Sequence, residues 1–528
     1  MSALPRLGRG VLSRSAGARA VKDWGSAPYP APQSPEGLDR VSPEGLGRES
    51  PEGLGRAGIV HLGLGNFHRA HQAVYTAEAL RHTDGPWGIT GVSTTPGRRP
   101  RPVIEGMAEQ GGLYSVLTLH RDGGFAATVP SVHRQGLVAD GQGADVVAAI
   151  GSADTRIVSL TVTEKGYTFG ADGRLDLDDP LVRADLAGGT PRTALGLIAR
   201  GLQQRLRAGA PPVTLLSCDN LMDNGHRLRT LLGEFVDVLP AAEREDLQAY
   251  VDGAVSTPNG MVDRIAPATT DEHRDLAARA LGVRDTVPVP AEPYKLWVMQ
   301  DDFRAGRPAW EHAGAVFTKD VAPYEVMKLR LLNGAHSLLA YLGLLRGHRS
   351  IDAAVGDELL GGAVEFAMRE EILPTVSEPD GMPGAAYIGE LLERFANPAL
   401  GHRTAQVGSD GSLKIPVRWA GTLTESLAAG RVPRVLALGF AAYVRVMTVE
   451  GAYDEPSLGA VHDGARARLV ELAARASGPE SAARLLLAEG GLLPQEAAQD
   501  EEFADAVAEF ARILDAHGAD AALRAARD

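Results

Sequence analysis

The 528-residue chain has a single cysteine, Cys218, so it can form neither an intramolecular disulfide nor a cysteine-based metal site. No apolar run approaches the roughly 18 to 20 residues that span a bilayer, and arginines interrupt the N-terminal segment where a secretory signal needs an apolar core. Positive charge is also scarce: the formal net charge is −14 and the pI is near 5.5. Phosphate backbones attract basic surfaces, so we expect a soluble cytoplasmic protein that binds neither nucleic acid nor membrane.

What is present has globular-enzyme proportions, with 44% hydrophobic and 23% charged residues. The exception is the N-terminal segment, where SPEGLDRV, SPEGLGRE and SPEGLGRA form an eight-residue repeat from Ser34. Such a segment buries too little apolar surface to offset its ordering entropy. The sequence therefore predicts a disordered, low-complexity tail over residues 1–56, followed by an N-terminal domain over 57–315 and a C-terminal domain over 316–528.

The N-terminal domain opens with GIVHLGLGNFHRAHQ, which predicts a buried strand over 59–62, a glycine turn and then a helix. In this arrangement glycines let the backbone approach a pyrophosphate, whose charge the helix N-terminus favours. The expected cofactor-binding residues are Gly63, Gly65, Asn66, Phe67 and His68. His68 stands where the dinucleotide fingerprint has its third glycine, so a tight structural turn without a nucleotide is the alternative.

Further strands are predicted at 87–95, 156–169 and 212–220, the last two separated by the helical segment TALGLIARGLQQRLRAG. Alternating strands and helices indicate a doubly wound α/β domain of Rossmann type with a largely parallel sheet. After the second strand, Thr94 lies where an acidic residue usually binds the adenosine ribose, and arginines follow it, so the sequence leaves NAD and NADP open.

Polar residues follow the later two strands at the end of the sheet where ligands bind, Lys165 after one and Asp219 and Asn220 after the other. The alternative is that Asp219 and Asn220 cap the next helix, as such residues often do. Cys218 is interpreted as a small buried hydrophobe.

The C-terminal domain shows helical apolar periodicity and is predicted to be mainly α-helical. Its segment MKLRLLNGAH carries Lys328, Asn333 and His336 in an otherwise apolar helix. At about 100° per residue, Asn333 lies about 140° and His336 about 80° around the helix from Lys328. A desolvated lysine is a general base for a secondary alcohol, with the other two residues donating to the oxygen. The alternative is a solvated lysine with an asparagine and a histidine that serve packing.

Several long segments in order resemble the long-chain mannitol dehydrogenase family, which includes the hexuronate reductases. These are GLGNFHRAHQA, TVTEKGY, SCDNLMDNG, STPNGMVDRIAPAT, EPYKLWV, RPAWE and MKLRLLNGAHSLLAYLG. The resemblance implies a monomeric, zinc-independent, NAD(P)-dependent polyol dehydrogenase with a Rossmann-type N-terminal domain and a helical C-terminal domain. It implies that Lys328 is the catalytic base and that Asn333 and His336 bind the reacting oxygen. It also implies that Asn220 and Asp263 lie at the substrate pocket.

One departure from the family pattern bears on the substrate. Where mannitol 2-dehydrogenases are expected to have an arginine eight residues before a substrate-contacting basic residue, this chain has Gln406 before Lys414. TVTEKGY and FANPALGHRTAQ resemble fructuronate reductase more closely, and Lys165 adds a cation for a carboxylate or phosphate. The substrate pairs left open are mannonate with fructuronate, mannitol with fructose, and mannitol 1-phosphate with fructose 6-phosphate. A non-catalytic nucleotide-binding sensor on the same fold is the alternative of another class.

Overall fold

The computed structural model of the chain describes residues 6–7, 57–94, 102–162, 166–170, 172–453 and 457–527. The chain divides into two compact units, the first ending at Val321 and the second beginning at Ala322. Lys165 and the arginines that follow Thr94 lie outside the described residues, as does most of the segment predicted to be a tail.

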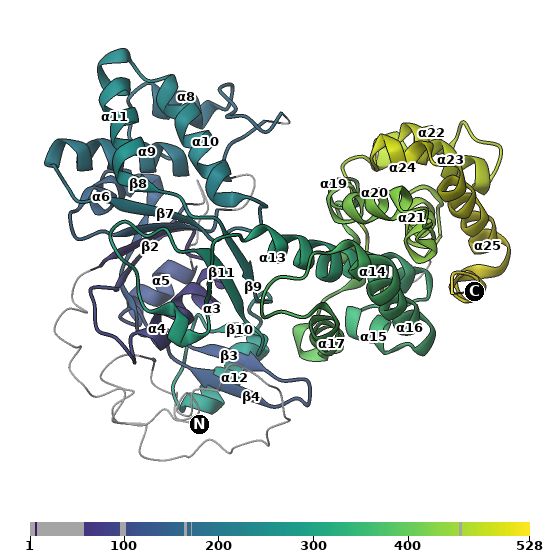
Figure 1. Cartoon of the computed structure of the whole chain (residues 1–528). Coiled ribbons are helices and arrows are strands. Elements are labelled where there is room, and N and C mark those ends of the chain that lie inside the picture. Colours follow the sequence, from purple (N-terminus) through teal and green to yellow (C-terminus); the bar gives the residue numbers. More distant parts are fainter. Residues whose placement is uncertain are drawn as a thin grey trace. The chain divides into compact units, whose positions relative to one another are not determined.

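Unit 1 is built on a six-stranded parallel sheet with the order β5-β2-β1-β6-β7-β8 (Figure 1). The chain starts in the middle of the sheet, moves outward on one side, and returns to continue on the other side, which is the doubly wound arrangement. The predicted α/β class is confirmed. The strands are β1 (Ile59–Leu62), β2 (Ile89–Ser93), β5 (His133–Val138), β6 (Ile157–Leu160), β7 (Val213–Ser217) and β8 (Val255–Ser256).

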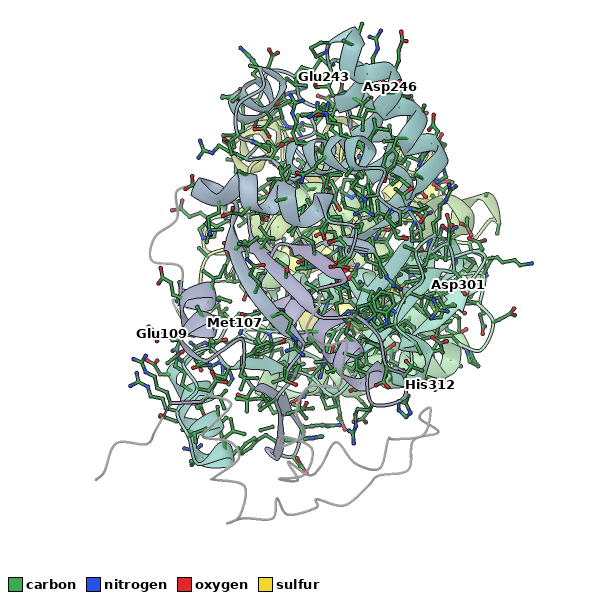
Figure 2. All side chains as sticks on the ribbon, turned by 90° about the vertical axis from the view of Figure 1, so that its left-hand side faces the viewer. Met107, Glu109, Glu243, Asp246, Asp301 and His312 are labelled. Carbon is green, nitrogen blue, oxygen red and sulfur yellow. The ribbon has the colours of Figure 1, made fainter. Side chains whose placement is uncertain are left out.

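Helices cover both faces of this sheet, which explains why β1, β6 and β7 are buried along their whole length. One core contains α6 (Ala139–Gly151), α9 (Ala194–Ala208), α10 (Asn224–Asp237) and α11 (Ala241–Ala254). The other contains α3 (Asn66–Ala70), α4 (Gln72–Ala79) and α5 (Pro102–Glu109). In Figure 2, α5 shows the two sides of such a helix: Met107 is buried in the core, whereas Glu109 is exposed.

Local sequence sets the ends of the predicted helix α9. The Thr193 hydroxyl accepts a hydrogen bond from the Gly196 N–H at 3.0 Å, and Gly209 ends the helix in the left-handed conformation with φ 60°. Both signals are visible in the sequence, and the observed helix therefore matches the predicted one.

Two three-stranded sheets complete unit 1. One has the order β10-β3-β4 and the other β12-β11-β9. Their strands are β3 (Val116–Leu119), β4 (Phe125–Thr128), β9 (Gly260–Asp263), β10 (Val289–Ala291), β11 (Leu296–Gln300) and β12 (Val316–Thr318), and α12 (Asp271–Leu281) packs near β3 and β4.

The first described residues, Arg6 and Leu7, lie within the segment predicted to be a disordered tail. Leu7 is buried and packs with Leu113 and Val283, and the Arg6 guanidinium donates to Glu109. An apolar side chain seated in a small cluster of unit 1 holds this short stretch, a contact that repeat composition alone does not reveal.

Unit 2 is helical over its described residues, which confirms the predicted class of the C-terminal half. Within the described part of the chain, no helix has both the length and the apolar character needed to cross a membrane. The helices are α13 (Ala322–Met327), η2 (Lys328–Asn333), α14 (Gly334–Leu345), α15 (Ile351–Gly356), α16 (Glu358–Phe366), η3 (Ala367–Ile372), η4 (Leu373–Thr375), α17 (Gly384–Phe395), η5 (Pro398–Leu400), α18 (Thr404–Gly408), α19 (Gly411–Arg418), α20 (Ala420–Ala428), α21 (Arg434–Thr448), α22 (Arg466–Ala473), α23 (Pro479–Glu489), α24 (Gln495–Gln499) and α25 (Glu501–Ala525).

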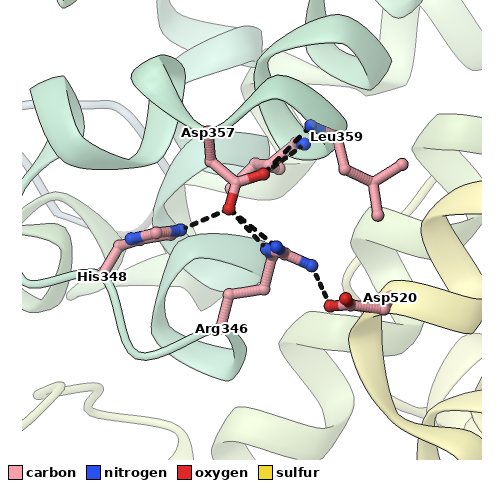
Figure 3. Close-up of polar contacts among 6 residues, drawn as sticks. Arg346, His348, Asp357, Leu359 and Asp520 are labelled. Carbon is pink, nitrogen blue, oxygen red and sulfur yellow. Dashed lines mark hydrogen bonds and ion pairs between the residues drawn. The ribbon is translucent and has the colours of Figure 1, made fainter.

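Helix α14 lies at the centre of unit 2, with every residue from Gly334 to Leu344 buried. A charged cluster fixes the chain where α14 ends (Figure 3). Arg346 Nη2 lies 2.7 Å and His348 Nε2 2.9 Å from one carboxylate oxygen of Asp357, whose other oxygen caps α16. Arg346 also contacts Asp520 of α25. The helix that carries the candidate catalytic residues is therefore anchored at its far end.

Candidate active site

The glycine turn of unit 1 follows β1, at the point where the strand order reverses between β1 and β6. Ligands of doubly wound sheets bind at this switch point. Gly63 has φ +105°, and a Cβ there would lie 2.0 Å from the Thr161 carbonyl oxygen, so only glycine fits. A Cβ on Gly65 would meet only the Gly63 oxygen, at 3.7 Å, so the turn is open above it. A phosphate can approach such an open backbone, and the turn fits a dinucleotide.

The other predicted cofactor residues lie around this turn. Asn66 donates to the Pro267 carbonyl at 3.0 Å and accepts from Arg69 at 2.8 Å, which fixes the start of α3. Phe67 is half-buried, and half-buried Thr94 directly follows β2. The turn and the end of β2 therefore come together at the same edge of the sheet.

His68 lies in the core beneath the turn rather than at its surface. Its ring is 0% exposed and stacks on His61 with 3.5 Å between ring centroids. Its Nδ1 lies 3.1 Å from the Gln72 amide oxygen and its Nε2 lies 3.0 Å from Nε2 of His133. Burial lowers the pKa of His68 well below 6.5, so the ring is neutral. The structure thus places this predicted cofactor contact in a supporting position, because both nitrogens are occupied inside the core.

The ends of β7 and β6 are joined by a buried polar contact. The Tyr167 hydroxyl donates to Asp219 at 2.9 Å, directly after β7. The alternative that Asp219 and Asn220 cap the next helix is wrong, because α10 begins after Asp223. Asn220 is exposed at the end of the strand, beside this rigid contact.

Asp263 is the last residue of β9 and is 5% exposed. It pairs across the small sheet with Leu296 of β11. The structure therefore places this predicted substrate residue at a strand end of unit 1, in a different sheet from β7, which precedes Asn220.

In unit 2, the segment predicted as a regular α-helix contains a π-helical turn over Lys328–Asn333. Here the Gly334 N–H donates to the Leu329 carbonyl, five residues back, so the turn holds an extra residue. Asn333 consequently lies about one turn beyond Lys328 on nearly the same side, and the regular-helix angle of about 140° is wrong for this pair. Lys328 is 9% exposed and Asn333 is half-buried.

His336 lies in the first turn of α14 and is 8% exposed. Its Nε2 is buried and has no hydrogen-bond partner among the described residues. The ring packs against Phe395, with 4.5 Å between centroids, and lies 5.9 Å from the ring of His402. Burial, aided by nearby cationic groups, lowers the pKa of His336 well below 6.5. A neutral imidazole with an unpartnered buried nitrogen is suited to hydrogen-bond a substrate oxygen.

Two residues at the junction of α19 and α20 hold this turn. Arg418 Nη1 donates to the Asn333 carbonyl at 3.2 Å and to the Ser337 hydroxyl at 2.9 Å. The Trp419 indole N–H donates to the Gly334 carbonyl at 3.2 Å. Consecutive side chains therefore bind consecutive carbonyls, just where the π-turn passes into α14.

Gln406 and Lys414, the two residues predicted to distinguish between substrates, lie on α18 and α19. Lys414 is one helical turn before Arg418 in α19, and its ammonium donates to the carbonyls of Val407 at 3.2 Å and Ser409 at 2.6 Å. Burial lowers the pKa of Lys414. Gln406 is exposed on α18. Lys414 thus ties α18 to α19, and much of its hydrogen-bonding capacity is already used.

Both units match one family. The family model of the mannitol dehydrogenase Rossmann domain matches residues 57–312, and that of the mannitol dehydrogenase C-terminal domain matches residues 320–511. The chain belongs to the mannitol dehydrogenase family. The predicted family and the predicted class of oxidoreductase are confirmed.

Relatives of known activity and structure agree with this membership. The chain is 39% identical over 454 residues to the D-mannonate oxidoreductase of Escherichia coli K12, covering 85% of this chain and 91% of that one. The ternary complex of Pseudomonas fluorescens mannitol 2-dehydrogenase with NAD and D-mannitol is similar with a TM-score of 0.76 and 33% identity, covering 89% and 94% of the two chains. A D-sorbitol dehydrogenase in substrate-free form has a TM-score of 0.79 and 31% identity, covering 89% and 95%.

The sequence interpretation missed Arg418 and Trp419. The available signal is a basic residue beside a tryptophan in the short helical segment after Lys414. It also missed Tyr167, because an aromatic residue in a loop gives no indication of the aspartate that it contacts.

Proposed function

We propose that the chain is an NAD(P)-dependent oxidoreductase that interconverts a secondary alcohol of a six-carbon aldonate or polyol with the corresponding ketose. The observation that carries the proposal is the π-turn, which brings Lys328 and Asn333 toward one side, followed by His336 with its unpartnered nitrogen. We propose the chain acts as a monomer on a small sugar substrate, without zinc.

In the oxidative direction, Lys328 in its neutral form takes the hydroxyl proton as the C–H bond breaks and C=O forms. The bound nicotinamide supplies the acceptor for the hydride, that is, for the proton and two electrons of the C–H bond. Asn333 and His336 donate hydrogen bonds to the oxygen while it carries alkoxide character. In the reductive direction Lys328 returns the proton to the oxygen.

The proposed cofactor is NAD, with NADP open. The open turn at Gly65 and the positive φ of Gly63 support dinucleotide binding by Gly63, Gly65, Asn66 and Phe67, with Thr94 near the ribose and His68 supporting the turn from below.

The substrate pair that we favour is mannonate with fructuronate. It is supported by the D-mannonate oxidoreductase relative and by the segments that resemble fructuronate reductase. Mannitol with fructose is second, supported by the mannitol 2-dehydrogenase relative. We assign Asn220, Asp263, Lys165, Gln406 and Lys414 to binding the rest of the substrate. Mannitol 1-phosphate with fructose 6-phosphate is a further alternative, and a non-catalytic nucleotide sensor is the alternative of another class.

The proposal is tested by following NADH and NADPH oxidation with the purified chain and, separately, fructuronate, fructose and fructose 6-phosphate. Selective reduction of fructuronate is the expected result, and the nucleotide that supports it decides between NAD and NADP. Nucleotide binding in a titration, without turnover of any of the three, would contradict an enzyme of this class and support the sensor.

A further inference from the structure

Three arginines lie in, at the end of, or against the helix formed by η2 and α14, and they differ in how their charge is balanced. Arg330, in the π-turn, pairs with Glu425 at 2.7 Å. Arg346, at the other end, pairs with Asp357 at 2.7 Å. Arg418 lies between them, and its hydrogen bonds within the described residues go only to the Asn333 carbonyl and the Ser337 hydroxyl, both uncharged.

A guanidinium in this position is held but not neutralised. Arg418 is half-buried, and removing a charge from water costs free energy unless an opposite charge compensates it. Lys414, one turn away on the same helix, adds a second cation that donates only to carbonyls, and the nearest carboxylates, those of Asp410 and Asp463, act on Lys414. Burial lowers the pKa of Arg418 to about 10, so it stays charged at neutral pH.

The charge of Arg418 lies close to the residues that we propose to bind the substrate. Arg418 contacts Asn333 and Ser337, and His336 lies between these two in the chain. The contacts therefore lie within about one helical turn, roughly 5.4 Å, of the groups proposed to hold the reacting oxygen. An open six-carbon chain spans that length.

We propose that Arg418 binds the carboxylate of the substrate and selects aldonates and keto-uronates over neutral polyols. The inference rests on the proposed function and extends it by naming the substrate class and the residue that recognises it. A guanidinium matches a carboxylate in planar geometry and charge. A phosphate carries about −1.5 to −2 charge at neutral pH, which the single positive charge of Arg418 does not balance.

The test compares fructuronate with fructose in the wild type and in Arg418→Gln. The expected result is a fall of about 30-fold in the ratio of kcat/KM for fructuronate to kcat/KM for fructose, mainly through the KM for fructuronate, because one charge-assisted contact is removed. Loss of the hydrogen bonds to Asn333 and Ser337 lowers both values alike and cancels in this ratio. Arg418→Lys, which keeps the charge, is expected to recover part of the preference. Equal losses for both substrates would overturn the proposal and leave Arg418 as a residue that only positions Asn333.

Trp419→Phe is the matched control, because it removes the neighbouring hydrogen bond to Gly334 without changing charge. It is expected to affect both substrates equally. If Arg418→Gln does not fold, inhibition of ketose reduction by the wild type tests the proposal instead. An anionic hexonate is expected to inhibit at least tenfold more strongly than mannitol. Equal inhibition by the two compounds overturns the proposal. Turnover of fructose 6-phosphate in preference to fructuronate also overturns it. A wild type that reduces no ketose instead refutes the proposed function itself.

Discussion

Each unit places a buried histidine at its irregular turn, but the two histidines differ in hydrogen bonding. Beneath the glycine turn, both ring nitrogens of His68 have partners. After the π-turn, Nε2 of His336 has none among the described residues. Burial lowers the pKa of both well below 6.5. Burial alone therefore does not separate a packing histidine from a chemical one. The difference between these two histidines is whether both ring nitrogens are hydrogen-bonded.

The largest expected effect is on kcat, through the proposed general base in the π-turn of unit 2. Lys328→Ala should lower kcat by about 10²- to 10⁴-fold, the usual contribution of a general base. NADH affinity in a titration should change by less than about twofold. Lys319→Ala removes an exposed lysine and is the control, with wild-type kcat expected. Wild-type turnover in Lys328→Ala would remove Lys328 from the mechanism.

The next prediction tests the unpartnered nitrogen directly. His336→Gln should lower kcat by about 100-fold, because a preorganised hydrogen bond to the developing oxyanion is displaced. Its melting temperature should stay near that of the wild type. His402→Gln, which alters the neighbouring ring, should change kcat by less than about threefold. Equal losses in the two variants would show that His336 acts only through packing.

In unit 1, the expected effect is on cofactor binding. Gly63→Ala places a Cβ 2.0 Å from the Thr161 oxygen at φ +105°, so the turn must shift. NADH binding should weaken by more than about tenfold. Gly209→Ala is the control: its φ is also positive, at +60°, but nothing lies within 4 Å of the added carbon. It should cost about 1 kcal/mol of stability and leave NADH binding unchanged.

The smallest expected effect concerns the pH dependence of stability. Burial lowers the pKa of His61 and His133 to about 3, from 6.5. The unfolded state therefore binds more protons below pH 6.5, and stability is complete above that pH and falls as pH decreases toward 3. Urea unfolding of unit 1 at pH 7.5, 6 and 5 measures this. Each histidine adds up to about 1.4 kcal/mol per pH unit, and His133→Gln should give a shallower dependence. A variant with the wild-type slope would contradict this assignment.

Much of the fold could be predicted because its signals are local. Apolar runs predict β1, β6 and β7, and Thr193 and Gly209 mark both ends of α9. The three-residue strands β10 and β12 carry too few residues for a recognisable pattern.

The candidate site was predictable in composition but not in geometry. The motif gives Lys328, Asn333 and His336 as residue types in one segment. Nothing in KLRLLN favours a π-turn, because the side chains of Arg418 and Trp419 that hold it come from 85 residues further along the chain. The role of His68 likewise depends on His133, which is 65 residues away.

The central claim is direct hydride transfer between the nicotinamide and the alcohol carbon, and isotope transfer tests it most directly. Fructuronate is reduced with NADH carrying deuterium at one or the other face of C4 of the nicotinamide, and the product is analysed by mass spectrometry. The expected result is one deuterium per mannonate from one labelled face and none from the other. Mannonate without deuterium from either cofactor would contradict the account.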